Sequence, residues 1–151
     1  MLKKAIEIDT NFVQASNLLA LTYATNFENS KAIELFLDNI KKADKINAFN
    51  EKAYALQKVG VIYRNNNNYI IAAEYFNRAL KIQIMNDDIS GQANTLLSLG
   101  KLQYKNDDRK GAYDNFMKSL KLSRQSNDLI NIISAYLELR NIHRRHFNLA
   151  F

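Results

Sequence analysis

The fold of this chain is decided by residues 56–80, which read L-Q-K-V-G-V-I-Y-R-N-N-N-N-Y-I-I-A-A-E-Y-F-N-R-A-L. Apolar residues recur at helical spacing on both sides of the asparagine run 65–68, which predicts two helices joined by a polar turn. The landmarks of this stretch return when the residue number is lowered or raised by 40; they are Ala20, Tyr23, Ala32 and Phe36, then Leu56, Gly60, Tyr63, Ala72 and Phe76, then Leu96, Gly100, Ala112 and Phe116. A fixed period of this length predicts an array of helical repeats, each burying its apolar face against its neighbours.

The period divides the chain into three repeats with a helix at each end. The repeats span residues 11–50, 51–90 and 91–127, with the first helix of the first repeat at 11–26. Residues 1–9 resemble the tail of a second helix and predict a short N-terminal half-repeat helix, while residues 128–146 predict a C-terminal capping helix. We therefore predict one all-α solenoid domain over residues 1–151. Since the period begins mid-repeat, the chain is either a fragment of a longer array or an array with a short N-terminal cap.

Side chains at the turns and between the helices have expected structural roles. Asn29 or Ser30 is expected to cap the second helix of the first repeat, and Asp88 to cap the first helix of the third. Small residues at 20, 60 and 100 are expected to face the alanines at 32, 72 and 112, so that paired helices approach closely. The phenylalanines at 36, 76 and 116 then fill the space between one helical hairpin and the next.

The composition excludes several classes of protein and site. The chain has no proline, which permits long helices, and no cysteine, which excludes disulfides, thiolate metal sites and a cysteine nucleophile. Its start lacks the apolar core of a signal peptide, and no stretch approaches the roughly 18 apolar residues of a membrane span. We expect a soluble, cytoplasmic protein that does not insert into a membrane.

The net charge of +6 is concentrated in the last third of the chain. From Lys101 onward there are ten basic and five acidic residues. A basic end can attract an acidic peptide, a nucleic acid or an anionic membrane surface, or it can serve only as a solvated face that maintains solubility.

No residue pattern indicates catalysis, a metal or a cofactor. His143 and His146 lie three residues apart on a predicted helix, but no cysteine or nearby carboxylate completes a metal site. The acidic pairs 87–88 and 107–108 fall where helices must begin, so helix capping explains them better than acid–base chemistry. The four glycines are scattered and form no phosphate-binding loop. We therefore predict that the chain is not an enzyme.

The recurring residues resemble the tetratricopeptide repeat family. Its pattern of Leu-Gly-x-x-Tyr followed by Ala, Phe and Ala is met in Val59-Gly60-x-x-Tyr63, Ala72, Phe76 and Ala79. The chain departs from the pattern at Asn39, which stands in place of alanine, and at Gln103, which stands in place of tyrosine. Its period is longer than is usual for the family and the closing proline is absent, features that resemble the longer-period subclass of kinesin light chains and bacterial peptide-sensing regulators.

The resemblance implies a right-handed superhelix whose first helices line a concave, peptide-binding groove. Amides and cations interspersed with tyrosines on these helices suit an acidic peptide or a carboxylate. The candidate groove residues are Gln14, Asn17, Leu21, Tyr54, Gln57, Lys58, Val61, Arg64, Asn94, Leu97, Lys101, Tyr104, Asn141 and Arg144. The implied function is a protein–protein interaction module: an adaptor, scaffold or sensor domain.

Two other functions stay open at the level of sequence. An assembly module would pair the ends of its array with copies of itself, since the start of the array leaves Ile6, Ile8 and Phe12 short of cover. Nucleic-acid binding by the basic last third is the weaker hypothesis, because no aromatic-plus-glycine RNA signature accompanies the charge.

Overall fold

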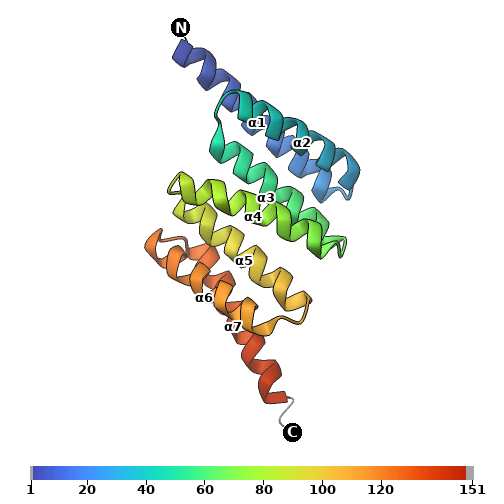
Figure 1. Ribbon diagram of the computed structural model, residues 1–151, viewed down its shortest axis with the longest axis vertical. Coiled ribbons are helices and arrows are strands. Elements are labelled where there is room, and N and C mark those ends of the chain that lie inside the picture. The colour runs from blue at the N-terminus through green and yellow to red at the C-terminus, as the bar shows by residue number, and fades with distance from the viewer. Residues whose placement is uncertain (1, 149–151) are drawn as a thin grey trace. The chain divides into compact units, whose positions relative to one another are not determined.

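The computed structural model describes residues 2–148, with the side chains at 2–3, 5–7 and 145–148 left out of the description (Figure 1). The described residues form seven helices and no strand, which confirms the all-α prediction. The helices are α1 (Leu2–Thr25), α2 (Asn29–Lys45), α3 (Phe49–Asn65), α4 (Tyr69–Met85), α5 (Ile89–Lys105), α6 (Arg109–Gln125) and α7 (Leu129–Asn148). None of them is long and apolar enough to cross a membrane.

The chain forms two compact units, unit 1 up to Ile82 and unit 2 from Gln83 onward. In unit 1, α2 packs against both α1 and α3, and α1 also contacts α3; in unit 2, α6 packs against both α5 and α7, and α5 also contacts α7. Within each unit, consecutive helices of these sets pack together, and the first helices of two successive repeats also touch. This is the packing of a helical-repeat solenoid. That the two units make a single domain stays a prediction.

Six turns of one geometry join the helices. Their central residues stand at a constant spacing along the chain and have φ between 53° and 64°; they are Phe27, Asn47, Asn67, Asp87, Asp107 and Asn127. In each turn the next residue donates its backbone N–H to a carbonyl five residues back, as from Glu28 to Tyr23 and from Asp128 to Ser123, both at 2.9 Å. This is a Schellman motif, which ends a helix on one left-handed residue. Since α2 to α6 each have 17 residues and the turns are alike, each helix with its turn takes the same length of chain. Two helices with their two turns therefore make the 40-residue period of the sequence.

The residue after each left-handed position becomes the cap of the next helix. Asp88 accepts a hydrogen bond from the Gly91 N–H at 2.8 Å, and Asp128 accepts one from the Asn131 N–H at 3.1 Å. The predicted cap at Asp88 is confirmed. The expected cap at Asn29 or Ser30 is wrong, because the Schellman motif places Glu28 at the capping position, where its side chain makes no capping bond.

The separate N-terminal helix predicted over residues 1–9 is also wrong, because α1 runs without a break from Leu2 to Thr25. The constant spacing of the turns would put the left-handed residue of such a break at position 7. That position holds Glu7, where most of the later turns have Asn or Asp. Since a glutamate gains nothing from the left-handed conformation that Asn and Asp tolerate, the helix continues.

The phenylalanines at 36, 76 and 116 are fully buried. In unit 1, Phe36 packs with residues of α1, α2 and α3, as predicted. The glycines have a role that differs from the expected one: a Cβ built on Gly60 would lie 2.8 Å from the ring of Phe76, and one on Gly100 would lie 2.5 Å from the ring of Phe116. Each glycine therefore makes room for the phenylalanine ring of its partner helix, not only for an alanine.

Candidate functional site

The candidate groove residues lie on the first helices of the repeats, which are α1 and α3 in unit 1 and α5 and α7 in unit 2. The two pairs of helices form two faces, one in each unit. We call them the α1/α3 face and the α5/α7 face.

The α1/α3 face carries a partly buried lysine against an aromatic ring. The Lys58 Nζ lies 4.9 Å from the centre of the Tyr54 ring, a cation–π contact. Burial lowers the pKa of the Lys58 ammonium below its usual value. Burial and, to a lesser extent, the nearby Glu51 carboxylate raise the pKa of the Tyr54 hydroxyl. Among the side chains that the structure describes, no carboxylate forms an ion pair with Lys58. Lys58 is thus a partly desolvated positive charge without an ion-pair partner among them.

Two further predicted residues of this face are accessible. Gln14 is exposed on α1. Arg64, at the end of α3, is partly buried and donates a hydrogen bond to the Asn65 Oδ1 at 3.2 Å. Leu21 and Val61 are also partly buried, so this face offers amide, cationic and apolar groups together.

Three of the predicted groove residues are buried, and their assignment to an accessible groove is wrong. Asn17, Gln57 and Leu97 are only 1%, 5% and 6% exposed. They occupy one position of the repeat, one period apart. This position points toward the neighbouring first helix: the Asn17 Nδ2 donates to the backbone oxygen of Glu51 on α3 at 3.2 Å, and Leu97 packs in a cluster with residues of α7.

Asn17 has a structural role that also accounts for the unusual Asn39. The Asn39 Nδ2 donates to the Asn17 Oδ1 at 3.0 Å, and the Asn39 Oδ1 accepts from the Ser16 hydroxyl at 2.8 Å. Both asparagines are buried, so these bonds satisfy polar groups that would otherwise be costly to bury. The departure from the family's alanine at position 39 is therefore matched by polar partners on α1.

The α5/α7 face differs because its lysine already has an acidic partner. The Lys101 Nζ lies 3.4 Å from the Glu138 Oε1, and the Asn94 Nδ2 donates to the Asn131 Oδ1 at 3.4 Å. Tyr104 packs beside the apolar cluster of this unit. Asn141 and Arg144 are exposed on α7. Of the predicted cations on this face, Arg144 is the exposed one and Lys101 the one paired with Glu138.

Sequence reasoning missed the acids Glu51 and Glu138, which lie on the same faces. A signal for Glu138 was present. In unit 2, residues whose numbers differ by 37 are neighbours on α5 and α7, as the pairs 94–131 and 101–138 show. This separation is one period of 40 residues less about one helical turn, because α5 and α7 are offset along their axes.

The described residues contain no group of three His, Cys, Asp or Glu side chains that could hold a metal ion. His143 lies with its ring 6.2 Å from the Tyr113 ring and perpendicular to it. The side chain of His146 lies outside the described residues.

Comparison with known proteins identifies the repeat. The tetratricopeptide repeat family model matches residues 53–83. A search of the curated proteins finds no match. A crystal structure of aspartyl phosphate phosphatase F from Bacillus subtilis is similar over 86% of this chain, with 17% identity and a TM-score of 0.80. A crystal structure of BtubC (BKLC) from P. vanneervenii is similar over 87%, with 17% identity and a TM-score of 0.76.

The N-terminal domain of stress-induced protein-1 from C. elegans is similar over 86% of this chain and 96% of its own length, with 14% identity and a TM-score of 0.65. The chain spans about a third of the phosphatase structure (34%) and about half of the BtubC structure (55%). At these identities the similarity establishes the fold. Residues 53–83 match the tetratricopeptide repeat model, and the chain as a whole has the fold of proteins built from such repeats.

Proposed function

We propose that this chain is a protein–protein interaction module whose α1/α3 face binds an acidic segment of another protein. Tetratricopeptide repeats typically form non-enzymatic interaction modules, and this supports the general function. The chemistry of the face supports the acidic partner.

The observation that carries the proposal is the state of Lys58. Removing an ammonium from water without an opposite charge is unfavourable, and the lowered pKa of Lys58 reflects that cost. A carboxylate placed beside it forms a charge-assisted hydrogen bond and compensates for the lost hydration. Tyr54 holds the lysine in position through its ring, and Arg64 supplies a second cation on the same helix.

Lys101 contributes less, because Glu138 already neutralises it. The proposed role of the α5/α7 face is therefore restricted to its exposed groups, Asn94, Asn141 and Arg144. This distinction makes the proposal testable: the cations of α3 should matter more for binding than Lys101.

The test measures binding of a fluorescein-labelled peptide of alternating Glu and Ala by fluorescence anisotropy. We expect wild-type protein to bind it, and Lys58→Met with Arg64→Gln to weaken binding roughly tenfold or more, since each charged hydrogen bond contributes about 1.5–3 kcal/mol. The matched control is Lys41→Gln with Lys81→Gln, which removes two exposed charges from α2 and α4. Equal losses in both variants would show that net charge, not this face, attracts the peptide.

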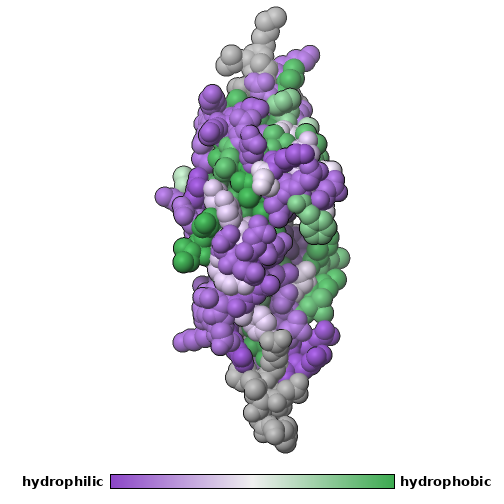
Figure 2. Space-filling model, turned by 90° about the vertical axis from the view of Figure 1, so that its right-hand side faces the viewer, coloured by the Kyte–Doolittle hydropathy of each residue, from purple (hydrophilic) through white to green (hydrophobic). Residues whose placement is uncertain are grey.

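A second candidate function is self-association through α1. Ile8, Phe12 and Leu19 are 59%, 61% and 49% exposed, and their spacing places them along one side of the helix. Figure 2 shows hydrophobic residues at the surface among polar ones on the face that it presents. Ile6 belongs to the same prediction, but its side chain lies outside the described residues. Light scattering across a concentration series tests the idea, because a constant mass near 17.4 kDa would exclude it.

A further inference from the structure

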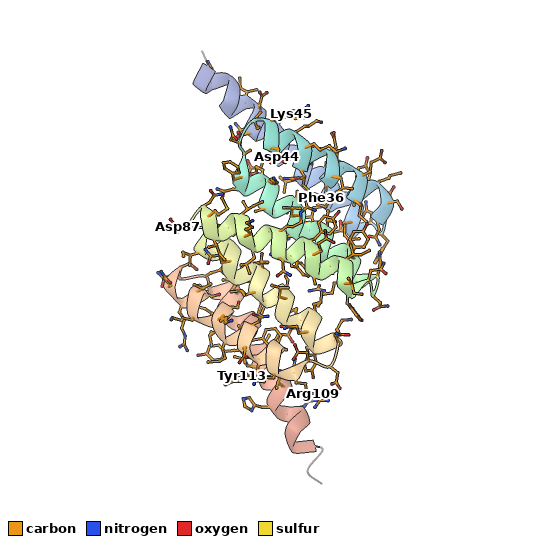
Figure 3. The ribbon with its side chains drawn as sticks, in the orientation of Figure 1. Phe36, Asp44, Lys45, Asp87, Arg109 and Tyr113 are labelled. Atoms are coloured by element: carbon orange, nitrogen blue, oxygen red, sulfur yellow. The ribbon has the colours of Figure 1, made fainter. Side chains whose placement is uncertain are left out.

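Unit 2 contains a hollow that belongs to neither of the faces described above. It has a volume of about 400 Å³ and is lined by Arg109, Lys110 and Tyr113 from α6 and by Ile142 and His143 from α7. We call it the α6/α7 hollow. Figure 3 labels Arg109 and Tyr113, which lie in the first turns of α6. Small-molecule sites have volumes of roughly 300–1,000 Å³, so the hollow is large enough for more than a bare ion.

The lining combines ring surfaces with positive charge. The rings of Tyr113 and His143 meet edge to face, and Ile142 is 6% exposed and belongs to the apolar cluster of unit 2. Arg109 makes an ion pair with Asp107 at 3.1 Å, but the Asp107 side chain is 84% exposed, so solvent screens this pair. Of the carboxylates whose side chains the structure describes, none pairs with Lys110, and none lines the hollow.

The repeat itself shows that packing does not require these residues. The equivalent positions of the first repeat, two periods earlier, hold Asn29, Ser30, Ile33, Ile62 and Tyr63. Only the buried isoleucine is the same in both. At the first two positions of the second helix, Asn29 and Ser30 are replaced by Arg109 and Lys110. At the other two positions, Tyr113 stands in place of Ile33 and His143 in place of Tyr63. The equivalent place in the first repeat is built from neutral residues, so the fold does not require the charge of the hollow.

We propose that the α6/α7 hollow binds a phosphate monoester carried on an aromatic ring. A phosphate monoester has a charge of about −1.5 to −2 at neutral pH, which matches two cations better than a single carboxylate does. The Arg109 guanidinium offers a planar fork to the phosphate oxygens, and Lys110 adds a mobile positive charge. The flat group of the ligand then packs against the rings of Tyr113 and His143. No residue of this site belongs to the proposed acidic-peptide face.

Isothermal titration calorimetry with phenyl phosphate tests the proposal on the full chain. We expect phenyl phosphate to bind, and inorganic phosphate to bind roughly tenfold more weakly, because it lacks the ring. Backbone amide NMR shifts should change at residues 109–113 and 142–143. No heat and no shift change with millimolar phenyl phosphate would overturn the proposal, as would equal affinities for the two ligands.

Two charge-matched variants separate the site from general electrostatic attraction. Arg109→Gln with Lys110→Gln should weaken phenyl phosphate binding about tenfold or more. Lys118→Gln with Lys121→Gln removes the same charge from exposed positions of the same helix and should leave the affinity unchanged. Comparable losses in the two variants would refute a specific site. Circular dichroism spectra confirm that both variants keep their helices.

A third variant and a second ligand test the ring contacts and the source of the ligand. Tyr113→Leu should remove the preference for phenyl phosphate over inorganic phosphate; a preserved preference contradicts the ring contact. A peptide containing phosphotyrosine is then compared with phenyl phosphate. Tighter binding of the peptide, lost in Arg109→Gln with Lys110→Gln, assigns the phosphate to a protein partner. Equal binding assigns it to a free aromatic phosphate.

Discussion

Replacing Phe27 with glycine should stabilise the protein, although it removes a large hydrophobic side chain. Phe27 holds a φ of 64° at the turn between α1 and α2, where the other five turns have Asn or Asp. The left-handed conformation costs a residue with a Cβ about 1–2 kcal/mol, and glycine avoids this cost but loses roughly 0.5–1 kcal/mol through its freedom in the unfolded chain. The side chain is 89% exposed, so its removal sacrifices little burial. We expect a net gain of about 0.5–1 kcal/mol for Phe27→Gly.

Thermal unfolding followed by circular dichroism measures this gain as a rise in Tm of about 1–4 °C for a chain of this size. Phe27→Asn should give a smaller rise, since asparagine tolerates the conformation but does not abolish the strain. Phe27→Ala is the control, because it removes the ring and keeps the Cβ, and its Tm should stay near that of the wild type. If alanine stabilises as much as glycine, the exposed ring and not the backbone is responsible. The reciprocal change Asn47→Phe, at a φ of 54°, should lower the Tm.

Three further predictions concern the core, the polar network and the caps. Gly100→Ala should destabilise by about 1–2 kcal/mol in urea unfolding, because overpacking against Phe116 outweighs the better helix propensity of alanine; a stabilised variant would show that the ring moves freely. Asn39→Ala should cost about 1–3 kcal/mol by leaving buried polar groups on α1 unsatisfied, and Asn39→Ser should recover part of that loss. Asp128→Ala should cost about 1 kcal/mol at pH 7. The Asn131 N–H, with Ser90 contributing less, lowers the pKa of Asp128, so this stabilisation is present above the usual aspartate pKa and is lost as the pH falls through the lowered value. The stability difference between wild type and Asp128→Ala should therefore shrink below about pH 4, and a constant difference would contradict the assignment.

Sequence reasoning predicted the helices well because their period is physically enforced by a recurring turn. Positions of the buried phenylalanines, the cap at Asp88 and the start of the last helix follow from counting along that period. The features that were missed depend on which residue stands at a single turn or cap position, and the period does not reveal this. Glu7 lacks the side chain by which Asn and Asp tolerate the left-handed turn, and Glu28 occupies the cap position although Asn29 and Ser30 are better capping residues.

The candidate groove was predicted less accurately, because the sequence does not show which positions of a first helix face the neighbouring first helix. The choice between accessible and buried positions on a first helix depends on the direction of the neighbouring first helix, and one such position was assigned wrongly in all three repeats. Lys58 and Lys101 also occupy different surroundings, since Lys101 has an acidic partner at 3.4 Å and Lys58 has a tyrosine ring. The partner of Lys101 comes from a different helix, so a sequence scan limited to one helix does not find it.

The six identical turns have a consequence for how such a chain can change its length. Because every helix from α2 to α6 has 17 residues and all the turns are alike, the smallest piece that can be copied without disturbing a hydrogen bond at its joints is one helix with one turn. A copy of that size would exchange the roles of first and second helices in everything that follows it, and so expose the buried phenylalanines. A copy of two helices with their two turns keeps each helix in its role. Duplication of residues 49–88, from the start of α3 to the cap of α5, is therefore the natural step by which this array can grow, and each step adds one more first helix.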